Sequence, residues 1–587
     1  MDAPHQQHDG APVVDLAADE PKVPAVPQSS PPPQVVERVV VRRGAFHDPV
    51  TLMAASEAAR GVAGVEHVAV GMVEPLNMVI FEQRFGYAVD GAELGPNDLV
   101  IAVRAAGDAA ADEALAVVER WLGARVGERE VVEVGPYVFA GERDGGERVE
   151  RIAWRVAQPG AYRDLLGRLE GRAGVIARAN DEAVARMQAA RPVVVGVARA
   201  GDVLSGMGRR TFLHAGPPIA WGEMSGPLRG ALIGAALLEG LAEDPEDAVR
   251  RAQAGEFEFA PGHERGALGP MAGVISASMP VWVVENTAHG NRVHCTFSEG
   301  LGGPFRFGAY APWVIERLRW VREVLAPVVA AALELLPAPL DLRAISADAV
   351  QMGDEVHNRN FAATAQLFRV LGPALMRTEA PAADRVAVAR YIAEDLFFYL
   401  NLSMAAGKAA ADAASGIEHS TIVTTMARNG TEFGLRVSGT GDRWFTAPSS
   451  IIQGCYLPGY RPEDANPDMG DSTITETTGL GGFIWAGAPS IGHFAGVSAE
   501  DALRATMAMY EITWAESVNY RIPALGYRGS PLGIDCRKVL ETGIVPIADT
   551  GIAHREPGVG IIGGGYVRPP MASFAAAVEV LADLIAA

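Results

Sequence analysis

The stretch PVVVGV, residues 192–197, is a β-branched run that predicts a buried strand. The segment TFLHAGPPIAWGEMSGPLRGALIGAALLEG (211–240) follows it, in which a polar loop rich in Gly and Pro leads into a helix of small residues. Gly226-Pro227 stands where proline is favoured, at a helix start. A strand is expected over 271–284, and helices are expected over 312–336, with a kink at Pro327, and over 384–415. Helices and strands alternate with Gly-rich loops to the end of the chain. We therefore predict a mixed α/β body over 192–587, with two subdomains that meet near 340–350.

The residues before this body predict a second, smaller α/β domain. Strands are expected at 39–41, 66–73 and 98–103, and helices at 50–60, 75–85 and 110–123. This alternation predicts an N-terminal α/β domain over 37–145, joined to the body by a helical connection over 146–191. Residues 1–36 hold eight prolines and five acidic residues, a composition that is typical of disordered segments. We therefore predict a disordered tail there.

Composition excludes several classes of partner. The net charge of the 587 residues is −21 and no Lys/Arg cluster offsets it, which argues against nucleic acid and anionic membrane surfaces. Three cysteines, Cys295, Cys455 and Cys536, lie far apart and predict neither a disulfide framework nor a zinc ribbon. The charge-free run 477–499 holds six glycines, so we predict a buried turn region rather than a membrane helix. With no signal-peptide pattern at the N-terminus, we expect a soluble, cytoplasmic protein.

The densest polar motif is QMGDEVHNRN, residues 351–360, between long apolar segments. It holds Asp354, Glu355, His357, Asn358, Arg359 and Asn360. The functional hypothesis assigns acid/base chemistry to His357 with the two acids, and substrate binding to the amides and Arg359. The alternative is a helix start with capping acids and a buried ion pair. If 354–368 is helical, His357 and Asp354 lie on different faces, which argues against an Asp–His dyad.

Two further blocks carry arginines and acids. In TMARNGTEFGLRVSGTGDRWF (425–445), Asn429-Gly430 predicts a hairpin turn, and Arg428 and Arg436 are candidates to bind an anion beside Asn429. The alternative is a hairpin that carries solvated charges. In NPDMGDSTITETTGLGGF (466–483) the acids do not have the spacing of an EF-hand, so we expect no metal site there and take Glu476 as a substrate-facing residue.

Glycines and histidines supply the remaining candidates. In DTGIAHREPGVGIIGGGYVRPP (549–570) the backbone amides of Gly551, Gly563 and Gly564 are predicted to hold a small anion, with His554 as a further catalytic candidate. The register is not that of a nucleotide-binding loop. His214 is a candidate substrate ligand, although a lone histidine is more often structural. The chain has neither H-E-x-x-H nor G-x-S-x-G, and we expect no cofactor or metal.

Several long phrases resemble the YlbE family (DUF1116). They are LHAGPPIAW, GPMAGVISASMPVWVVEN, MGDEVHNRN, FFYLNLSMAAGKAAADAA, STIVTTMARNGTEFGLRVSG, PDMGDSTITETTGLGGF and TGIAHREPGVGIIGGG, spread over about 175–587. The segment VRRGAFHDPVTLMAASEAARGVAGVEHVAVGMVEPLNMVIF with NDLVIAVRA, within about 38–125, is similar to the N-terminal portion of FdrA proteins. The two resemblances imply a fusion of two subunits in one chain.

The resemblance implies a function. FdrA- and YlbE-type proteins are subunits, with a third, of the oxamate carbamoyltransferase of allantoin catabolism, a part of purine degradation and nitrogen metabolism. That system turns oxalurate and phosphate into oxamate and carbamoyl phosphate. The chain departs from FdrA proteins because it has no CoA-binding or phosphohistidine region, and it lacks the S-T-R-T signature of other carbamoyltransferases.

We therefore expect a carbamoyltransferase-like enzyme that acts on a small ureido or amide carboxylate. Phosphorolysis needs anion clamps, donors to the carbamoyl carbonyl and an acid/base. The hypothesis gives His357 the proton transfer, Arg359 and Arg428 the anions, and Asn358 or Asn429 the carbonyl. Two alternatives stay open, a hydrolase or amide-forming enzyme on similar substrates and a non-catalytic subunit. We also expect a homo-oligomer and an additional carbamoyltransferase subunit as partner.

Overall fold

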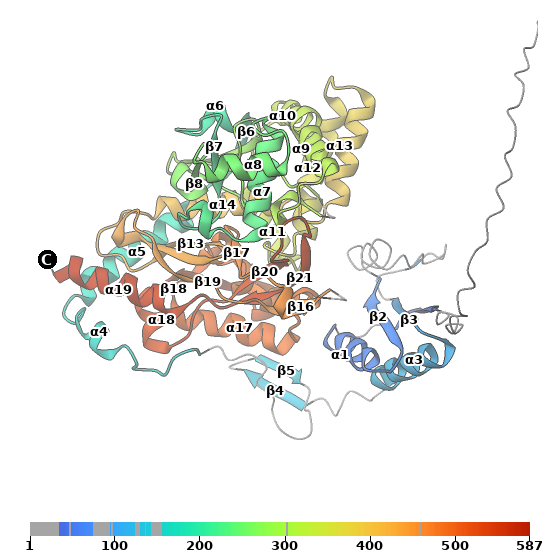
Figure 1. Ribbon diagram of the computed structural model, residues 1–587. Coiled ribbons are helices and arrows are strands. Elements are labelled where there is room, and N and C mark those ends of the chain that lie inside the picture. Colours follow the sequence, from blue (N-terminus) through green and yellow to red (C-terminus); the bar gives the residue numbers. More distant parts are fainter. Residues whose placement is uncertain are drawn as a thin grey trace, which may run out of the picture.

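The computed structural model describes residues 35–45, 49–73, 94, 98–123, 130–134, 137–141, 155–300, 303–457 and 460–586. The helix expected at 75–85 lies outside these residues, as does the tail predicted over 1–36 apart from its last two residues. The fold is α/β, with helices and strands mixed in several sheets (Figure 1). The predicted fold class is confirmed.

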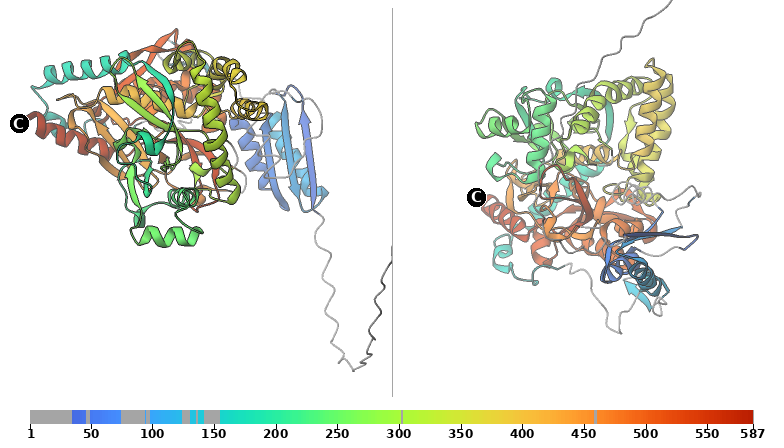
Figure 2. Two further views of the ribbon diagram at one scale, coloured as in Figure 1. Left: turned by 90° about the horizontal axis from the view of Figure 1, so that it is seen from above. Right: turned by 45° about the vertical axis from the view of Figure 1, so that its right-hand side comes forward.

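The N-terminal domain is a three-stranded antiparallel sheet with two helices. The strands β1 (Val36–Arg42), β2 (Val65–Met72) and β3 (Leu99–Ala105) pair in the order β1-β3-β2. The helices α1 (Pro49–Arg60) and α3 (Asp108–Gly123) pack on each other and on this sheet, shown in blue in Figures 1 and 2. These elements confirm the predicted strands and helices of this region. A hairpin of β4 (Glu130–Val134) and β5 (Tyr137–Gly141) follows.

The body opens with a five-stranded sheet that contains the PVVVGV stretch. Its order is β12 (Leu340–Asp341), β6 (Pro192–Arg199), β10 (Pro280–Asn286), β11 (Arg292–Thr296) and β9 (Ala267–Leu268). The strand prediction for 192–197 is confirmed, but the strand is not buried throughout, since Val195 is 43% exposed. The reason is that β6 pairs antiparallel on both sides, and an antiparallel sheet can leave one face to solvent. A strand expected over 271–284 begins only at Pro280.

The later part of the chain adds smaller antiparallel sheets, orange to red in Figure 1. One has the order β15 (Phe445–Pro448), β14 (Glu432–Val437), β13 (Val423–Asn429) and β17 (Met469–Gly470). Another has the order β16 (Gln453–Tyr456), β21 (Ile561–Val567) and β20 (Ala548–Ala553). Two pairs complete the set, antiparallel β18 (Thr513–Ile522) with β19 (Arg528–Ile534) and parallel β7 (Thr211–His214) with β8 (Glu258–Pro261).

Helices cover these sheets. The longer ones are α5 (Ala173–Ala189), α7 (Gly226–Leu238), α8 (Pro245–Gln253), α9 (Pro312–Trp320), α10 (Ala326–Glu334), α11 (Leu342–Gln351), α12 (Phe361–Arg377), α13 (Ala382–Glu394), α14 (Leu400–Ala413), α17 (Ala499–Ile512) and α19 (Met571–Ala586). The shorter ones are α4 (Arg163–Gly167), α6 (Ala200–Val203), α15 (Ile474–Thr477), α16 (Gly492–Ala495) and α18 (Cys536–Thr542), beside several 3-10 turns. No helix among the described residues is long and apolar enough to cross a membrane.

Two expected helices differ from the structure in instructive ways. The helix expected over 312–336 contains a π-helical turn, η4 (Val321–Leu325), directly before Pro327. Proline lacks the N–H that would continue the α-helical pattern, so the backbone widens there. The helix expected over 384–415 is two helices, α13 and α14, separated by a turn in which Asp395 accepts a hydrogen bond from the Phe397 N–H.

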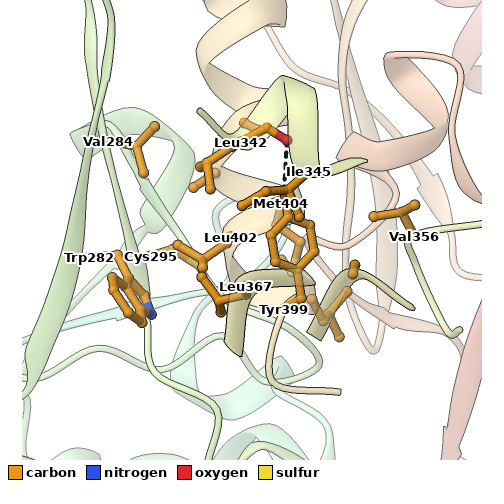
Figure 3. Packing of buried hydrophobic residues seen from close by; sticks show 14 of the residues in the cluster. Trp282, Val284, Cys295, Leu342, Ile345, Val356, Leu367, Tyr399, Leu402 and Met404 are labelled. Atoms are coloured by element: carbon orange, nitrogen blue, oxygen red, sulfur yellow. Dashed lines mark hydrogen bonds between the residues drawn. The ribbon is translucent and has the colours of Figure 1, made fainter. Parts of the chain in front are cut away.

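The largest core cluster joins the five-stranded sheet to the helices around α14. Figure 3 shows Trp282 and Cys295 of the sheet near Leu402 and Met404 of α14. The Tyr399 hydroxyl donates to the Leu342 carbonyl at 2.7 Å, which fixes the start of α11 against that of α14 (Figure 3). Val356 belongs to the same cluster and is completely buried. The core therefore reaches the polar motif itself, because His357 is the next residue.

Candidate functional site

The motif QMGDEVHNRN is a tight turn between two helices rather than part of a helix. Helix α11 ends at Gln351 and α12 begins at Phe361, so the helical-face argument for 354–368 is wrong. Glu355 causes the turn, because its carboxylate accepts hydrogen bonds from the backbone N–H of His357 at 2.8 Å and of Arg359. Asp354 accepts from the Ala363 N–H at 2.9 Å and caps α12, as the alternative interpretation predicted.

The turn contains a strained residue. Val356 has a φ of +65°, in the left-handed region that a β-branched side chain rarely adopts. Two hydrogen bonds hold it there: its N–H donates to the Arg359 carbonyl at 3.1 Å, and its carbonyl accepts from the Ser403 hydroxyl at 2.6 Å. Strain of this kind persists only where the surroundings impose it, and it is frequent at functional sites. In this chain it turns the neighbouring His357 inward.

His357 meets two carboxylates from distant parts of the chain. Its Nδ1 lies 2.8 Å from Glu476 Oε1, on α15, and 2.8 Å from Asp549 Oδ1, on β20. Glu355 is the third acid of the group, and all four side chains are buried. We call His357, Glu476, Asp549 and Glu355 the His357 centre. The sequence alone proposed His357, Glu355 and Glu476 as site residues, and the structure adds Asp549.

The electrostatics of the His357 centre follow from burial and from its three acids. Burial by itself would lower the pKa of His357, but Glu476 and Asp549 outweigh it and hold the pKa well above its usual value. Burial, reinforced by Asp549, raises the pKa of Glu355 well above its usual range, and burial also raises the pKa of Glu476. Burial by itself would raise the pKa of Asp549 as well, but the effect of His357 outweighs burial, and the pKa of Asp549 is lowered.

Neighbouring residues fix the two distant carboxylates. Glu476 Oε1 accepts from the Gly482 N–H at 3.1 Å, and Oε2 accepts from the Thr475 hydroxyl at 2.9 Å. Gly481 has a φ of +57°, and a Cβ there would lie 2.1 Å from Glu476 Oε1, so only glycine leaves room for the carboxylate. Asp549 Oδ2 accepts from Trp485 Nε1 at 3.0 Å. The centre is thus held rigidly from outside.

Arg428 forms a separate buried network, which we call the Arg428 network. Its Nε and Nη2 donate to the two carboxylate oxygens of Asp468 at 2.5 and 2.9 Å. Nη1 donates to the Gly470 carbonyl and the Thr473 hydroxyl, and Nη2 also donates to the Thr550 hydroxyl. All five N–H groups of the guanidinium therefore have partners within the protein. Arg428 joins β13, β17 and β20 and has no donor left for a substrate anion.

His214 lies in a third buried group, with His263 and Asp471. His263 Nε2 is 3.4 Å from Asp471 Oδ1 without making a hydrogen bond, while Asp471 accepts from the N–H groups of Gly216 and Gly269. His214 Nδ1 lies 2.8 Å from the Ala215 carbonyl oxygen, and its Nε2 has no hydrogen-bond partner. Burial lowers the pKa of both histidines, which favours the neutral imidazole in each. Contacts among the described residues do not join this group to His357.

Two further residues were predicted to bind substrate, Asn429 and Arg436. Asn429 stabilises the predicted hairpin turn, since its Oδ1 accepts from the N–H groups of Thr431 and Glu432. Arg436 lies over the Trp444 ring and near Asp442 and Glu264. Both side chains are thus engaged by the protein, and neither contacts the His357 centre.

The residues next to His357 keep unused polar atoms. Asn360 donates to the His357 carbonyl at 2.5 Å, but its Oδ1 has no partner, and neither has Asn358 Nδ2. The Arg359 side chain is 27% exposed, lies 4.5 Å from the Phe361 ring centroid and has its Nε 3.5 Å from Asp354 Oδ1. Arg359 is therefore the cation that reaches from this turn toward solvent.

The glycine-rich segment 549–565 is a hairpin. Gly551 pairs with Gly564 across β20 and β21, and Gly563 pairs with Ile552. Since β21 also pairs with β16, its backbone groups serve the sheet on both sides. His554 follows β20, stacks edge-on with Tyr460 and accepts from the Glu556 N–H. The predicted anion site at Gly551, Gly563 and Gly564 stays a prediction, and His554 makes none of the described contacts of the His357 centre.

Sequence reasoning missed Asp549, Asp471, His263 and Trp485 as members of buried polar groups. Asp549 stands first in a glycine-rich block, where the glycines drew the interpretation to backbone amides. The signal that could have found it is its own position, a lone carboxylate that opens a β-strand of otherwise small and apolar residues. His263 and Asp471 lie more than 200 residues apart, and no spacing rule connects them.

Known proteins match both parts of the chain. A family model described as "Oxamate carbamoyltransferase subunit AllG" matches residues 257–472. The Escherichia coli (strain K12) protein of that name is 46% identical over 410 residues, which cover 70% of this chain and 98% of the relative. The chain belongs to the family of the oxamate carbamoyltransferase subunit AllG. The expected names YlbE and FdrA are not tested by these matches.

Two further relatives support the assignment of the body. The Escherichia coli protein named "Uncharacterized protein YahG" is 45% identical over 403 residues, 69% of this chain and 85% of the relative. A crystal structure of a conserved protein of unknown function from Enterococcus faecalis V583 superposes with a TM-score of 0.69 at 44% identity, covering 70% of this chain and 98% of that one. The AllG-like body is therefore a fold that occurs without the N-terminal domain.

The N-terminal domain matches a model described as "AllF, heavy metal-associated domain", over residues 35–133. The residues there do not fit a soft heavy metal, because the range contains no cysteine and only two histidines, His47 and His67. Thiolate ligands select such metals, and the three cysteines of the chain lie at 295 and beyond. The domain thus matches this family model over a range that holds no thiolate ligand.

Proposed function

We propose that the chain is a subunit of an oxamate carbamoyltransferase-type enzyme in which an AllG-like body and an AllF-like N-terminal domain are fused. One observation carries the proposal: the body is 46% identical to the Escherichia coli AllG subunit over 98% of its length, and the same chain also matches the AllF domain model. Because the relative is named as a subunit, we propose that a further subunit acts with this chain.

The substrates proposed are a small ureido or amide carboxylate of the oxalurate or oxamate type, with phosphate or carbamoyl phosphate. In the phosphorolytic direction a phosphate oxygen attacks the carbamoyl carbon of oxalurate. The bond from that carbon to the nitrogen of the oxamate portion breaks, and this nitrogen takes up a proton to leave as oxamate. Such a reaction needs cations for two anions and polarised donors at the carbonyl.

We place the reaction near the turn 353–360. The strained Val356, the unused polar atoms of Asn358 and Asn360, and the unmatched charges of the His357 centre lie within this turn or in contact with it. Arg359 is the candidate to bind a substrate anion, since its guanidinium is partly exposed. Arg428 is not proposed for this role, because the protein already uses its five N–H groups.

The test is to incubate the purified chain with oxalurate, with and without phosphate, and to follow oxamate and carbamoyl phosphate. Phosphate-dependent turnover supports the transferase, and turnover without phosphate supports a hydrolase instead. Silence of the chain alone, followed by activity with an extract of its native cells, supports a subunit that needs its partner. No turnover under any of these conditions contradicts the proposal.

Variants separate the site from the rest of the chain. We expect His357→Ala and Arg359→Gln to reduce turnover at least about 100-fold, the scale of losing a preorganised group. His289→Ala is the matched control, because His289 is exposed and the hydrogen bond described for its side chain joins it to the Arg186 carbonyl, away from the turn 353–360. Full activity of both His357→Ala and Arg359→Gln would remove the reaction from this turn.

A further inference from the structure

The three side chains of His357, Glu476 and Asp549 have the spacing of metal ligands. Nδ1 lies 2.8 Å from one oxygen of each carboxylate, and the three ligand atoms lie within 4.8 Å of one another. Neighbouring ligands on a six-coordinate ion with bonds of about 2.1 Å are about 3.0 Å apart. The two distances from His357 Nδ1 are thus close to the spacing of neighbouring ligands on such an ion.

The hydrogen bonds of the His357 centre do not satisfy all three of these atoms. Nδ1 can carry only one proton, and that proton serves Glu476 Oε1, with which the hydrogen bond forms. Asp549 Oδ1 lies at the same distance but has no hydrogen-bond partner, and the Asp549 side chain is completely buried. An unpartnered buried carboxylate oxygen is costly, and here it lies within 4.8 Å of the other two atoms.

The charges of the His357 centre are also incomplete. Three buried carboxylates surround one imidazole, and the described contacts of these acids include no lysine or arginine side chain. Arg428, on β13, is matched by Asp468. A divalent cation would supply the missing positive charge, because buried acids otherwise need protons or paired cations.

The surroundings resemble those that orient metal ligands. The second oxygen of each carboxylate has its own donor, Trp485 Nε1 for Asp549 and the Thr475 hydroxyl for Glu476. Such outer hydrogen bonds fix the direction in which a ligand oxygen points. Gly481 keeps space beside Glu476 that a side chain would fill. Three ligands on one side leave the remaining positions to water or substrate.

We propose that His357 Nδ1, Glu476 Oε1 and Asp549 Oδ1 bind one divalent metal ion in six-coordinate geometry. One imidazole with two carboxylates and no thiolate favours a cation such as Mn²⁺, which accepts both nitrogen and oxygen ligands. The sequence predicted no metal site, because spacing rules test ligands that are close in the chain, and these stand at 357, 476 and 549. The inference does not rest on the proposed carbamoyl transfer, since metal binding is measured without turnover.

The test uses the full-length chain after EDTA treatment and titration with Mn²⁺, followed by electron paramagnetic resonance. We expect one tightly bound Mn²⁺ per chain, with coupling to a nitrogen nucleus from the imidazole of His357. Because the wild-type chain is measured, the test holds even if a variant does not fold. Mn²⁺ bound weakly to the acidic surface shows no nitrogen coupling, and absence of a bound ion with that coupling overturns the proposal.

A graded set of variants locates the site. We expect Glu476→Gln and Asp549→Asn to weaken Mn²⁺ binding more than about 100-fold, and Trp485→Phe by about 10–100-fold, because Trp485 only orients Asp549. Asp471→Asn is the matched control, a buried acid on the same segment whose oxygens accept from Gly216 and Gly269, and its affinity should stay within about 2-fold. Equal affinity of the wild type and Glu476→Gln overturns the assignment, as does retention of the nitrogen coupling in His357→Gln.

Discussion

Two buried acids on the segment 466–482 have opposite surroundings. Asp468 receives two hydrogen bonds from Arg428, whose other N–H groups are also satisfied, so charge and hydrogen bonding are complete. Glu476 lies eight residues further along, where it shares His357 with Asp549 and leaves an oxygen of Asp549 without a donor. The first network holds strands together, while the second has capacity for a ligand.

The comparison teaches how to separate a structural charge from a functional one when both are buried. Both networks are buried and both join acids to a basic side chain, but the balance of donors, acceptors and charges differs. A balanced buried pair stabilises as long as both members remain, and breaking it is costly. A buried group of acids with excess negative charge must bind protons or a cation. Such groups are frequent at functional sites.

The largest expected effect compares Asp468→Asn with Glu476→Gln in the metal-free chain. Asp468→Asn leaves the Arg428 charge buried without its counter-charge and should lower the free energy of unfolding by about 3–5 kcal/mol. Glu476→Gln should change it by less than about 1 kcal/mol, because Asp549 still lies beside His357 as a counter-charge and glutamine keeps the shape of the side chain. Denaturant unfolding at neutral pH measures both, and equal losses would break the distinction between the two networks.

A second prediction concerns the space beside Glu476. Gly481→Ala places a Cβ 2.1 Å from Glu476 Oε1 at a positive φ, and should cost about 3 kcal/mol or more as strain and clash combine. Gly526→Ala is the matched control, with a φ of +63° and no atom within 4 Å of its Cβ. The control should lose only about 1–2 kcal/mol. Equal unfolding midpoints for the two variants would show that Gly481 serves the backbone alone.

A smaller, pH-dependent effect belongs to Asp354, whose pKa burial raises to about 6. In the unfolded chain the pKa of an aspartate is about 3.9, so the folded state binds more protons between these values. Stability should therefore fall as the pH rises from about 4 through 6, by about 2 kcal/mol in all. Asp354→Asn should lose this slope, which unfolding at pH 4.5 and pH 7.5 measures. An unchanged difference between the two pH values would contradict the raised pKa.

The smallest expected effect is at Arg359. Its ion pair with Asp354 is partly exposed, so Arg359→Gln should change the free energy of unfolding by less than about 1 kcal/mol. Under the proposed function the same variant loses turnover, and the two measurements together separate binding from folding. A loss of several kcal/mol would place Arg359 with Arg428 among the structural charges.

The sequence predicted much of the secondary structure and proposed three of the four members of the His357 centre. β-Branched runs such as 192–197 and 39–41 form strands, and Asn429-Gly430 forms the hairpin turn, because these signals are local. The sequence left open a helix over 354–368, whereas the structure has a turn over 353–360. Glu355 prevents the helix by accepting backbone N–H groups, a choice that depends on burial by the surrounding core.

The partners of His357 could not be predicted, because they are set by tertiary packing. Glu476 and Asp549 arrive from a short helix and a strand that are 119 and 192 residues away. Arg428 had the same appearance in sequence as Arg359, a basic residue in a polar block. The fold distinguishes them by giving one a complete set of acceptors and leaving the other at the surface.

The most direct test of the unbalanced centre is a crystal structure of the full-length chain soaked in Mn²⁺, with anomalous diffraction at the manganese edge. The account predicts one anomalous peak about 2.1–2.3 Å from His357 Nδ1, Glu476 Oε1 and Asp549 Oδ1, the usual range for such ligands. A structure with no peak there, in which Nδ1 donates to Glu476 and a proton or water satisfies Asp549, would contradict it.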